Sequence, residues 1–228
     1  MRIRPAAAAL LALVFGIFPL SAQFCPTSND AWYPPFSLAQ RARIGEAGEK
    51  VLESAFPRGF PPLAATLADE HGTVWWSGYG GADEFLAFEM PAFSGAAEKL
   101  GRMLGSDGRF PGLPAFFDAL DLMDTKLGKG NLLSSTPLDL AVLAMVLAMD
   151  GEFRDGQVIS EAAIRKIGFT WAIEEISDSG WALAYRIDSK SRLAAVLAAR
   201  TEDIQPLGGQ AALGAALEAL ISAAQSFR

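Results

Sequence analysis

The sequence predicts an α+β fold: one antiparallel sheet flanked by N- and C-terminal helices, with an inserted helical region. Three observations lead to this prediction. Strand-like segments lie near both ends of the chain, helical patterns lie between them, and the capped apolar helix in residues 136–151 precedes a hairpin in residues 181–199. No repeat or linker divides residues 37–228, so we expect them to form a single domain.

The first 22 residues have the composition of a signal peptide. Arg2 and Arg4 form a positive start, an apolar run covers residues 6–20, and small residues around Ala22 offer a cleavage site. The run is short for a membrane span. We therefore expect cleavage near Ala22 and a periplasmic or secreted protein without a stable membrane span, a retained N-terminal anchor being the alternative.

Residues 23–36 are aperiodic and rich in Pro, Asn, Ser and aromatic residues, which predicts an extended N-terminal tail. Cys25 is the only cysteine, so no intrachain disulfide can form. Phe24 stands where lipoprotein cleavage requires a small residue. We expect Cys25 to be an inert tail residue, with a free thiol or an intermolecular bridge as the alternatives.

A helix is predicted to begin at Ser37, which forms a capping box with Gln40. Residues 63–68 and 74–79 have the pattern of two strands, and residues 69–73 supply the turn between them. The expected apolar stripe of the helix consists of Leu38, Ile44, Val51, Leu52 and Phe56.

Two helices are predicted in the middle of the chain. Ser94 caps the first, which extends to about Leu104, and residues 114–127 form the second. The buried face of the second is expected to consist of Phe116, Phe117, Leu120 and Met123.

The second half of the chain begins with the helix capped by Thr136 and stopped by Gly151, and a shorter helix follows Ser160. Residues 181–187 and 193–199 form the predicted hairpin, whose second strand is apolar on both faces, as in a central strand. A last helix is expected in residues 205–227.

The charge of the chain argues against nucleic acid and anionic lipid as partners. It carries 26 acidic and 19 basic residues, a formal net charge of −7, and no basic cluster. The glycines at Gly78, Gly80 and Gly81 lack the strand-to-helix context of a phosphate-binding loop. We therefore expect no nucleotide and no other cofactor.

These segments, in this order, resemble the serine β-lactamase and penicillin-binding-protein superfamily, in particular its class C-like serine hydrolase and esterase branch. Glutaminases of the same superfamily are a secondary comparison. The resemblance rests on Tyr79-Gly80 with Ala82-Asp83, the Met-Asp-Thr turn in residues 120–125, the helix start at residues 136–140, the turn in residues 150–161, and the closing hairpin in residues 181–200.

The resemblance implies three catalytic motifs, and none of them is present. No Ser-x-x-Lys occurs in the chain, and Ser94 and Lys99 diverge by about 140° around a helix. Neither Tyr-x-Asn nor Ser-x-Asn lies between Lys99 and Leu120. The segment 168–188, where the family has its Lys-Thr-Gly or His-x-Gly strand, contains no lysine or histidine.

We therefore predict no catalytic residue. If the protein is active, Ser94, Ser134 and Ser179 are the candidates for a rebuilt nucleophile. His71 is the only histidine, and we expect it to be a surface turn residue and not part of a triad or a metal site. Asp69, Glu70, Asp83, Glu84 and Glu89 are expected to be solvated turn acids, not an acid–base pair or a calcium site.

Trp75 and Trp76 alternate to opposite faces of a strand, and we expect both to be core residues, a carbohydrate or peptide platform being the alternative.

Three functional hypotheses follow from the sequence as a whole. The first is an exported β-lactamase-like domain that is inactive and binds cell-wall peptide or an exported protein partner. The second is a serine hydrolase, an esterase or amidase with a rebuilt active site. The third is a decayed chain with an incomplete core.

Overall fold

The computed structural model describes residues 35–82, 88–90, 101–102, 112–128, 133–154, 156–167, 172–176 and 180–228, all within the unit Tyr33–Arg228. The expected signal peptide, most of the expected tail with Cys25, and the candidates Ser94 and Ser179 lie outside the described residues. Asp83, Glu84 and most of the helix expected after Ser94 also lie outside them.

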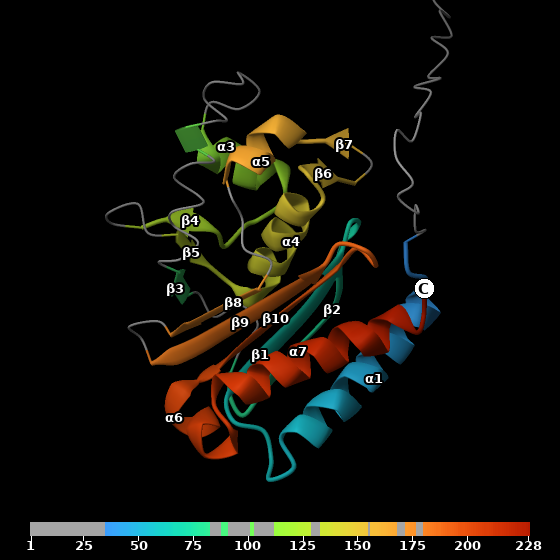
Figure 1. Ribbon diagram of the computed structural model, residues 1–228, viewed down its shortest axis with the longest axis vertical. Helices are drawn as coiled ribbons and strands as arrows, with labels where there is room; N and C mark the ends of the chain where they lie inside the picture. Colours follow the sequence, from blue (N-terminus) through green and yellow to red (C-terminus); the bar gives the residue numbers. More distant parts are fainter. Residues whose placement is uncertain are drawn as a thin grey trace, which may run out of the picture. The chain divides into compact units, whose positions relative to one another are not determined.

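A five-stranded antiparallel sheet is the centre of the fold, in the order β2-β1-β10-β9-β8 (Figure 1). Strand β10 is the middle strand, and its residues 193–199 are all buried, which confirms the prediction of a central strand. The five strands are β1 (Leu63–Asp69), β2 (Gly72–Tyr79), β8 (Ala172–Ile176), β9 (Trp181–Asp188) and β10 (Leu193–Arg200).

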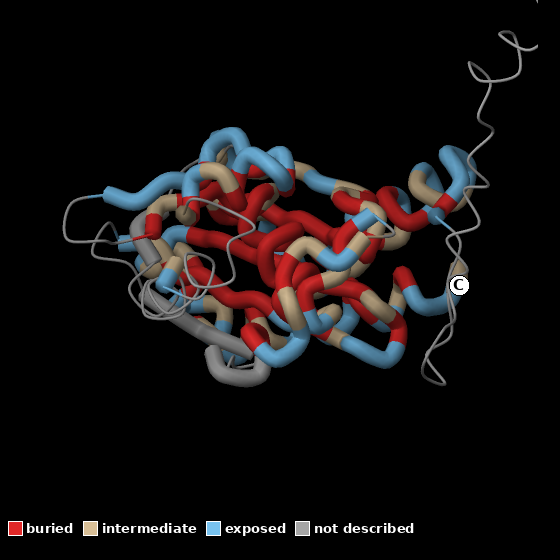
Figure 2. The backbone as a smooth tube through the Cα atoms, turned by 90° about the horizontal axis from the view of Figure 1, so that it is seen from above, coloured by how far each residue is buried: buried red, intermediate tan, exposed pale blue. Residues whose placement is uncertain are grey.

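Two helices, α1 (Leu38–Ala55) and α7 (Gln210–Gln225), lie side by side on one face of this sheet, and α4 (Pro137–Ala148) packs on the other (Figure 1). Each face is covered by its own cluster of buried hydrophobic side chains. Seen from above, the buried segments run through the middle of the molecule and the exposed ones lie outside (Figure 2). A decayed chain was expected to lack a continuous core or to leave the helical side of its sheet bare, and the described residues show neither feature.

Helix α1 begins as predicted. The Ser37 hydroxyl accepts a hydrogen bond from the Gln40 amide, and the Gln40 side chain accepts one from the Ser37 amide. Gly45 lies against the ring of Trp75, which a Cβ there would approach to 3.0 Å, so glycine lets the helix pack closely on the sheet. The prediction for Leu38 was wrong: it is 87% exposed, because it stands at the first helical position and points away from the sheet.

Helix α4 also begins as predicted, with the Thr136 hydroxyl accepting from the Asp139 amide and Pro137 at the first position. After the helix, Gly151 has φ 89°, and a Cβ at this position would overlap the carbonyl group of Ile159. Only glycine fits there, and this position turns the chain back toward the helix it has just left.

The polypeptide on the α4 side of the sheet forms short elements. A three-stranded sheet has the order β3-β5-β4, and β6 pairs with β7. Sequence reasoning did not predict these strands or β8. The elements are β3 (Phe88–Met90), α3 (Leu113–Ala119), β4 (Lys126–Leu127), β5 (Leu133–Ser135), β6 (Glu152–Phe153), β7 (Gly156–Gln157) and α5 (Glu161–Ile167).

The prediction of a helix in residues 114–127 was wrong for the second half of this range. Helix α3 ends at Ala119, Asp121 has φ 57°, and Met123 is 84% exposed instead of buried. The chain turns here because the amide of Leu122 donates to Phe117 O and the next residues bind the side chain of Asp139.

The last predicted helix is also interrupted. Between β10 and α7 lie α6 (Thr201–Ile204) and a 3₁₀ turn, η2 (Gln205–Leu207), and α7 starts only after the positive φ angles of Gly208 and Gly209. Of the helices that the structure describes, none is by itself long and apolar enough to cross a membrane. The pair Thr201–Leu207 and Gln210–Gln225, bent by 82°, meets that test together by length and composition.

Candidate functional site

Ser134 is the one candidate nucleophile within the described residues. It is the middle residue of β5, and its Cα lies opposite those of Glu89 in β3 and Lys126 in β4. Its neighbours Leu133 and Ser135 are fully buried, so the alternation of the strand places the partly exposed Ser134 on the outer face, with the exposed Lys126.

A directly opposed cross-strand pair has its Cβ atoms about 5 Å apart. Lys126 is therefore the nearest basic residue that the strand register gives to Ser134. Within the described part of the chain, however, the Ser134 hydroxyl makes no hydrogen bond, and Lys126 makes no ion pair. The serine and the amine are neighbours without the contact that activates a nucleophile.

A hydroxyl–carboxylate network, formed by Thr125, Ser135, Thr136 and Asp139, lies directly behind Ser134. Asp139 Oδ2 accepts from the amide of Asp124 and from the hydroxyl of Thr125, both at 2.9 Å. Thr125 Oγ1 lies 2.7 Å from Ser135 Oγ. The Thr125 hydroxyl gives its proton to Asp139, and the Ser135 hydroxyl also lies 3.4 Å from the carbonyl oxygen of Thr136, to which it can donate.

The hydroxyl–carboxylate network is a structural feature, not a reactive site. Ser135 and Thr136 are 0% and 1% exposed, and their hydroxyls are used within the network. Burial raises the pKa of Asp139, while the hydrogen bonds from Thr125 and the Asp124 amide act in the opposite direction. Thr136 was predicted to be the N-cap of α4, but the binding of Asp139 to the turn before β4 was not predicted.

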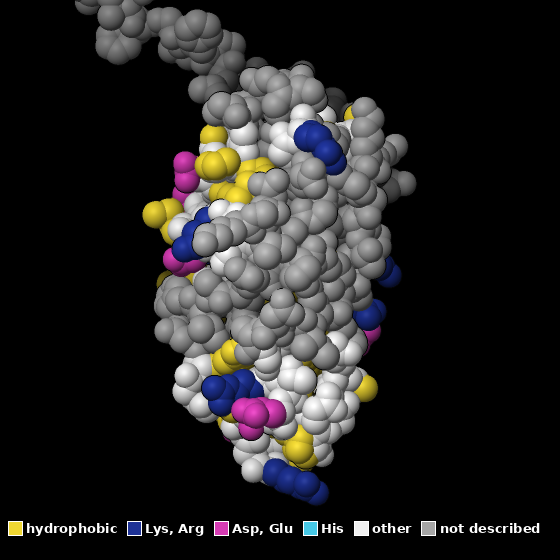
Figure 3. Space-filling model, turned by 90° about the vertical axis from the view of Figure 1, so that its left-hand side faces the viewer, with side chains coloured by type: hydrophobic (Ala, Val, Ile, Leu, Met, Phe, Trp, Pro, Cys, Tyr) yellow, Lys and Arg dark blue, Asp and Glu magenta, His cyan; other side chains and the backbone are white. Residues whose placement is uncertain are grey.

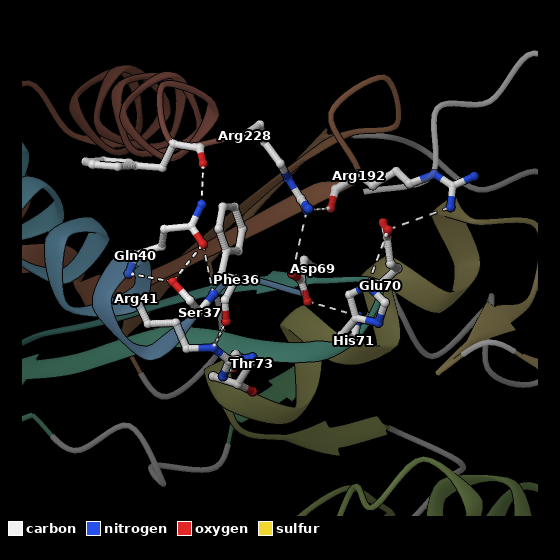
Figure 4. Close-up of polar contacts among 11 residues, drawn as sticks. Phe36, Ser37, Gln40, Arg41, Asp69, Glu70, His71, Thr73, Arg192 and Arg228 are labelled. Atoms are coloured by element: carbon white, nitrogen blue, oxygen red, sulfur yellow. Dashed lines mark hydrogen bonds and ion pairs between the residues drawn. The ribbon is translucent and has the colours of Figure 1, made fainter. Parts of the chain in front are cut away.

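A charge cluster lies where the β1–β2 and β9–β10 turns meet Arg228, three residues after the end of α7 (Figure 4). It consists of Asp69, Glu70, His71, Arg192 and Arg228. The prediction of solvated turn residues was wrong here. Asp69 is 1% and Glu70 7% exposed, and the His71 side chain is only 10% exposed. Arginines from distant parts of the chain cover the turn, and local sequence patterns do not indicate them.

The ion pairs of the charge cluster are longer than hydrogen bonds. Arg228 Nη2 lies 3.6 Å from Asp69 Oδ2, Arg192 Nη1 lies 3.8 Å from Glu70 Oε1, and His71 Nε2 lies 3.6 Å from the same oxygen. Asp69 Oδ2 and both Glu70 oxygens are buried without a hydrogen bond. Burial raises the pKa of Asp69 and of Glu70. The hydrogen bond from the His71 amide to Asp69 Oδ1, at 2.9 Å, and the charges of Arg192 and Arg228 reduce this effect without reversing it.

The two tryptophans of β2 have different environments. Trp75 packs under α1, as expected, whereas Trp76 is 46% exposed on the opposite face of the edge strand, where the prediction of a core residue was wrong. Among the described residues, no three His, Cys, Asp or Glu side chains are grouped so that they could hold a metal ion. Basic and acidic side chains are interspersed over the described parts of the face in Figure 3.

The architecture is similar to that of a solved transpeptidase domain of a penicillin-binding protein. The transpeptidase domain of penicillin-binding protein 3 from Burkholderia pseudomallei is similar over 80% of this chain and 93% of that chain, with a TM-score of 0.56 and 12% sequence identity. This likeness shows the fold, and it confirms the predicted α+β class and, at the level of the fold, the family resemblance seen in the sequence.

Two other solved structures are more distantly similar. The transpeptidase domain of FtsI4 from Legionella pneumophila has a TM-score of 0.46 at 11% identity, over 69% of this chain and 85% of that one. A Bacillus glutaminase has a TM-score of 0.41 at 13% identity, over 70% and 90% of the two chains. No protein-family model matches the sequence, and no curated protein matches it either.

Proposed function

We propose that this protein is an exported domain with the transpeptidase fold that binds cell-wall peptide, or an exported protein partner, without forming a covalent intermediate. The observation that carries the proposal is the absence of any Ser-x-x-Lys in the chain. In serine enzymes of this fold, a lysine one helical turn after the serine takes its proton, and the serine is a weak nucleophile without such a base.

The geometry of Ser134 agrees with this proposal. A general base must lie within about 2.6–3.2 Å of the hydroxyl that it activates. Among the described residues, no side chain forms a hydrogen bond with the Ser134 hydroxyl, and the neighbouring Ser135 hydroxyl is buried and already bonded. An activated serine is therefore absent from the described residues, which supports a non-covalent role.

The test is labelling of the folded protein with a fluorescent penicillin and with a fluorophosphonate. We expect no covalent label on wild type. Ser94→Ala, Ser134→Ala and Ser179→Ala identify the nucleophile if a label appears, and Ser222→Ala, on the exposed face of α7, is the matched control. A label removed by one of the three variants, but not by the control, would overturn the non-covalent proposal.

Binding is measured separately, by cosedimentation with purified peptidoglycan. Retention of the unlabelled protein in the pellet supports cell-wall peptide as the ligand. A protein that is neither labelled nor retained contradicts the peptide ligand and leaves the protein partner. Export is tested by expressing the full chain in a bacterium and determining the mass of the exported form, which is expected to begin near residue 23.

A second candidate function is a serine hydrolase that uses Ser134 as nucleophile and Lys126 as base. It is favoured by the direct cross-strand pairing of these two residues. If it holds, Ser134→Ala and Lys126→Met each abolish fluorophosphonate labelling, whereas Lys190→Met, at an exposed turn on another strand pair, does not. Labelling that survives Lys126→Met contradicts this assignment.

A further inference from the structure

The charge cluster joins segments that are far apart in the sequence. The guanidinium of Arg228 stacks over the ring of Phe36, 4.2 Å from its centroid, and donates to the carbonyl of Arg192 at 3.4 Å. Phe36 is itself buried, and its carbonyl accepts from Arg41 Nε at 3.2 Å. Figure 4 shows these groups around Asp69 and Glu70. Phe36, which lies just before α1, is thus connected to Arg228, which lies three residues after α7.

The β6–β7 hairpin reaches the same place, because the amide of Arg154 donates to the carbonyl of Glu70 at 3.2 Å. The described side chains whose charge acts on the two carboxylates belong to different elements. Arg41 lies on α1, Arg192 in the β9–β10 turn and Arg228 in the segment after α7, while the His71 ring lies in the β1–β2 turn. The carboxylates are also adjacent and repel each other. The protonation state of Asp69 and Glu70 therefore affects every segment that contributes to the charge cluster.

We propose that the charge cluster is a pH-dependent contact. It holds Phe36, the β1–β2 and β9–β10 turns and the segment after α7 together when Asp69 and Glu70 are protonated, and it loosens when they ionise. The geometric basis is that three buried carboxylate oxygens lack hydrogen bonds, and that two of them, Asp69 Oδ2 and Glu70 Oε1, have their ion-pair partners only at 3.6–3.8 Å. Buried charge in such an arrangement is poorly compensated.

The direction follows from linkage. Burial raises the pKa of Asp69 and Glu70 in the closed cluster, and an opened cluster exposes both to water, where their pKa returns to the ordinary value. Protonation therefore favours the closed form, and a rise in pH favours opening. Each proton released on opening changes the opening equilibrium by up to about tenfold per pH unit.

Hydrogen exchange of the full chain, followed by mass spectrometry at about pH 4 and about pH 8 and corrected for intrinsic exchange, tests the proposal. We expect peptides that cover residues 69–73, 189–193 and 226–228 to open several-fold more often at the higher pH. Peptides from α4 serve as the internal reference and are expected to keep a constant protection.

Glu70→Gln and Asp69→Asn remove the titrating groups and are nearly isosteric. We expect either variant to reduce the pH dependence in these peptides, and the double variant to abolish it. The matched control is Glu46→Gln, an exposed acid on α1 that should change nothing. The proposal is overturned if local opening in wild type is the same at both pH values, if the double variant keeps the wild-type dependence, or if α4 opens in parallel. Because the first and third criteria use wild type alone, they hold even if a variant does not fold.

Discussion

The two buried polar clusters differ in how their charges are compensated. In the hydroxyl–carboxylate network, Asp139 accepts two hydrogen bonds of 2.9 Å, and its partners lie close to it in the sequence. In the charge cluster, Asp69 and Glu70 have arginines at 3.6 Å and 3.8 Å, and three of their four oxygens accept no hydrogen bond. The carboxylate of the first cluster is satisfied by directional bonds, whereas in the second cluster only Asp69 Oδ1 accepts one, from the His71 amide at 2.9 Å, and the other three oxygens are compensated only by nearby opposite charges.

This difference separates a fixed structural element from an adjustable one. A buried polar network in which every group is bonded rigidifies its surroundings, whereas an incompletely bonded one is costly and sensitive to conditions. The hydroxyl–carboxylate network fixes the turn before β4 to the start of α4 and so sets the position of β5 and Ser134. The charge cluster only joins the periphery of the large sheet.

The largest effect is expected for Asp139→Ala. It leaves the buried hydroxyl of Thr125 and the partly buried amide of Asp124 without their acceptor, which costs about 3 kcal/mol in the free energy of unfolding. Asp139→Asn keeps one acceptor oxygen and should cost about 1 kcal/mol. Urea denaturation followed by circular dichroism measures both, with the exposed Asp118→Ala as control. Equal losses for Asp139→Ala and Asp118→Ala would show that the network does not support the fold.

A smaller effect is expected for Arg228→Ala, about 1–2 kcal/mol near neutral pH, since it removes the stacking on Phe36 and the cation beside Asp69. The loss is smaller than for Asp139→Ala because Asp69 can become neutral by taking up a proton, whereas the unpaired amide of Asp124 has no comparable way to reduce its cost. The same denaturation measurement is made with Arg58→Ala, an exposed arginine, as control. A loss as large as that of Asp139→Ala would mean that the two clusters are equally rigid.

The elements that local chemistry determines were predicted from the sequence. The caps at Ser37 and Thr136 and the apolar pattern of β10 each depend on neighbouring residues, and all three were confirmed. The order of these elements also led to the correct fold class. The helix expected through Met123 failed because a side chain on α4, that of Asp139, binds the turn that replaces it.

The candidate site was less predictable. Hydrophobic patterns do not indicate that Ser134 faces Lys126, because both lie in strands of two or three residues, too short to show a period. Likewise, Asp69 and Glu70 have the composition of an exposed turn, and only the fold brings Arg192 and Arg228 over them. Such contacts join residues that are far apart in the sequence, so single-sequence reasoning has no signal for them.

The smallest expected effect concerns the pH dependence of global stability. Burial raises the pKa of Asp69 and Glu70 above the unfolded values near 3.8 and 4.5, so their favourable contribution is fully present below those values and is lost as pH rises through the folded pKa. The double variant Asp69→Asn with Glu70→Gln should therefore be more stable than wild type near neutral pH, by less than about 1 kcal/mol, and this advantage should vanish at about pH 4. Urea midpoints across this range measure the difference. An advantage for wild type near neutral pH would mean that the arginines compensate the two carboxylates fully, and the contrast between the two clusters would then disappear.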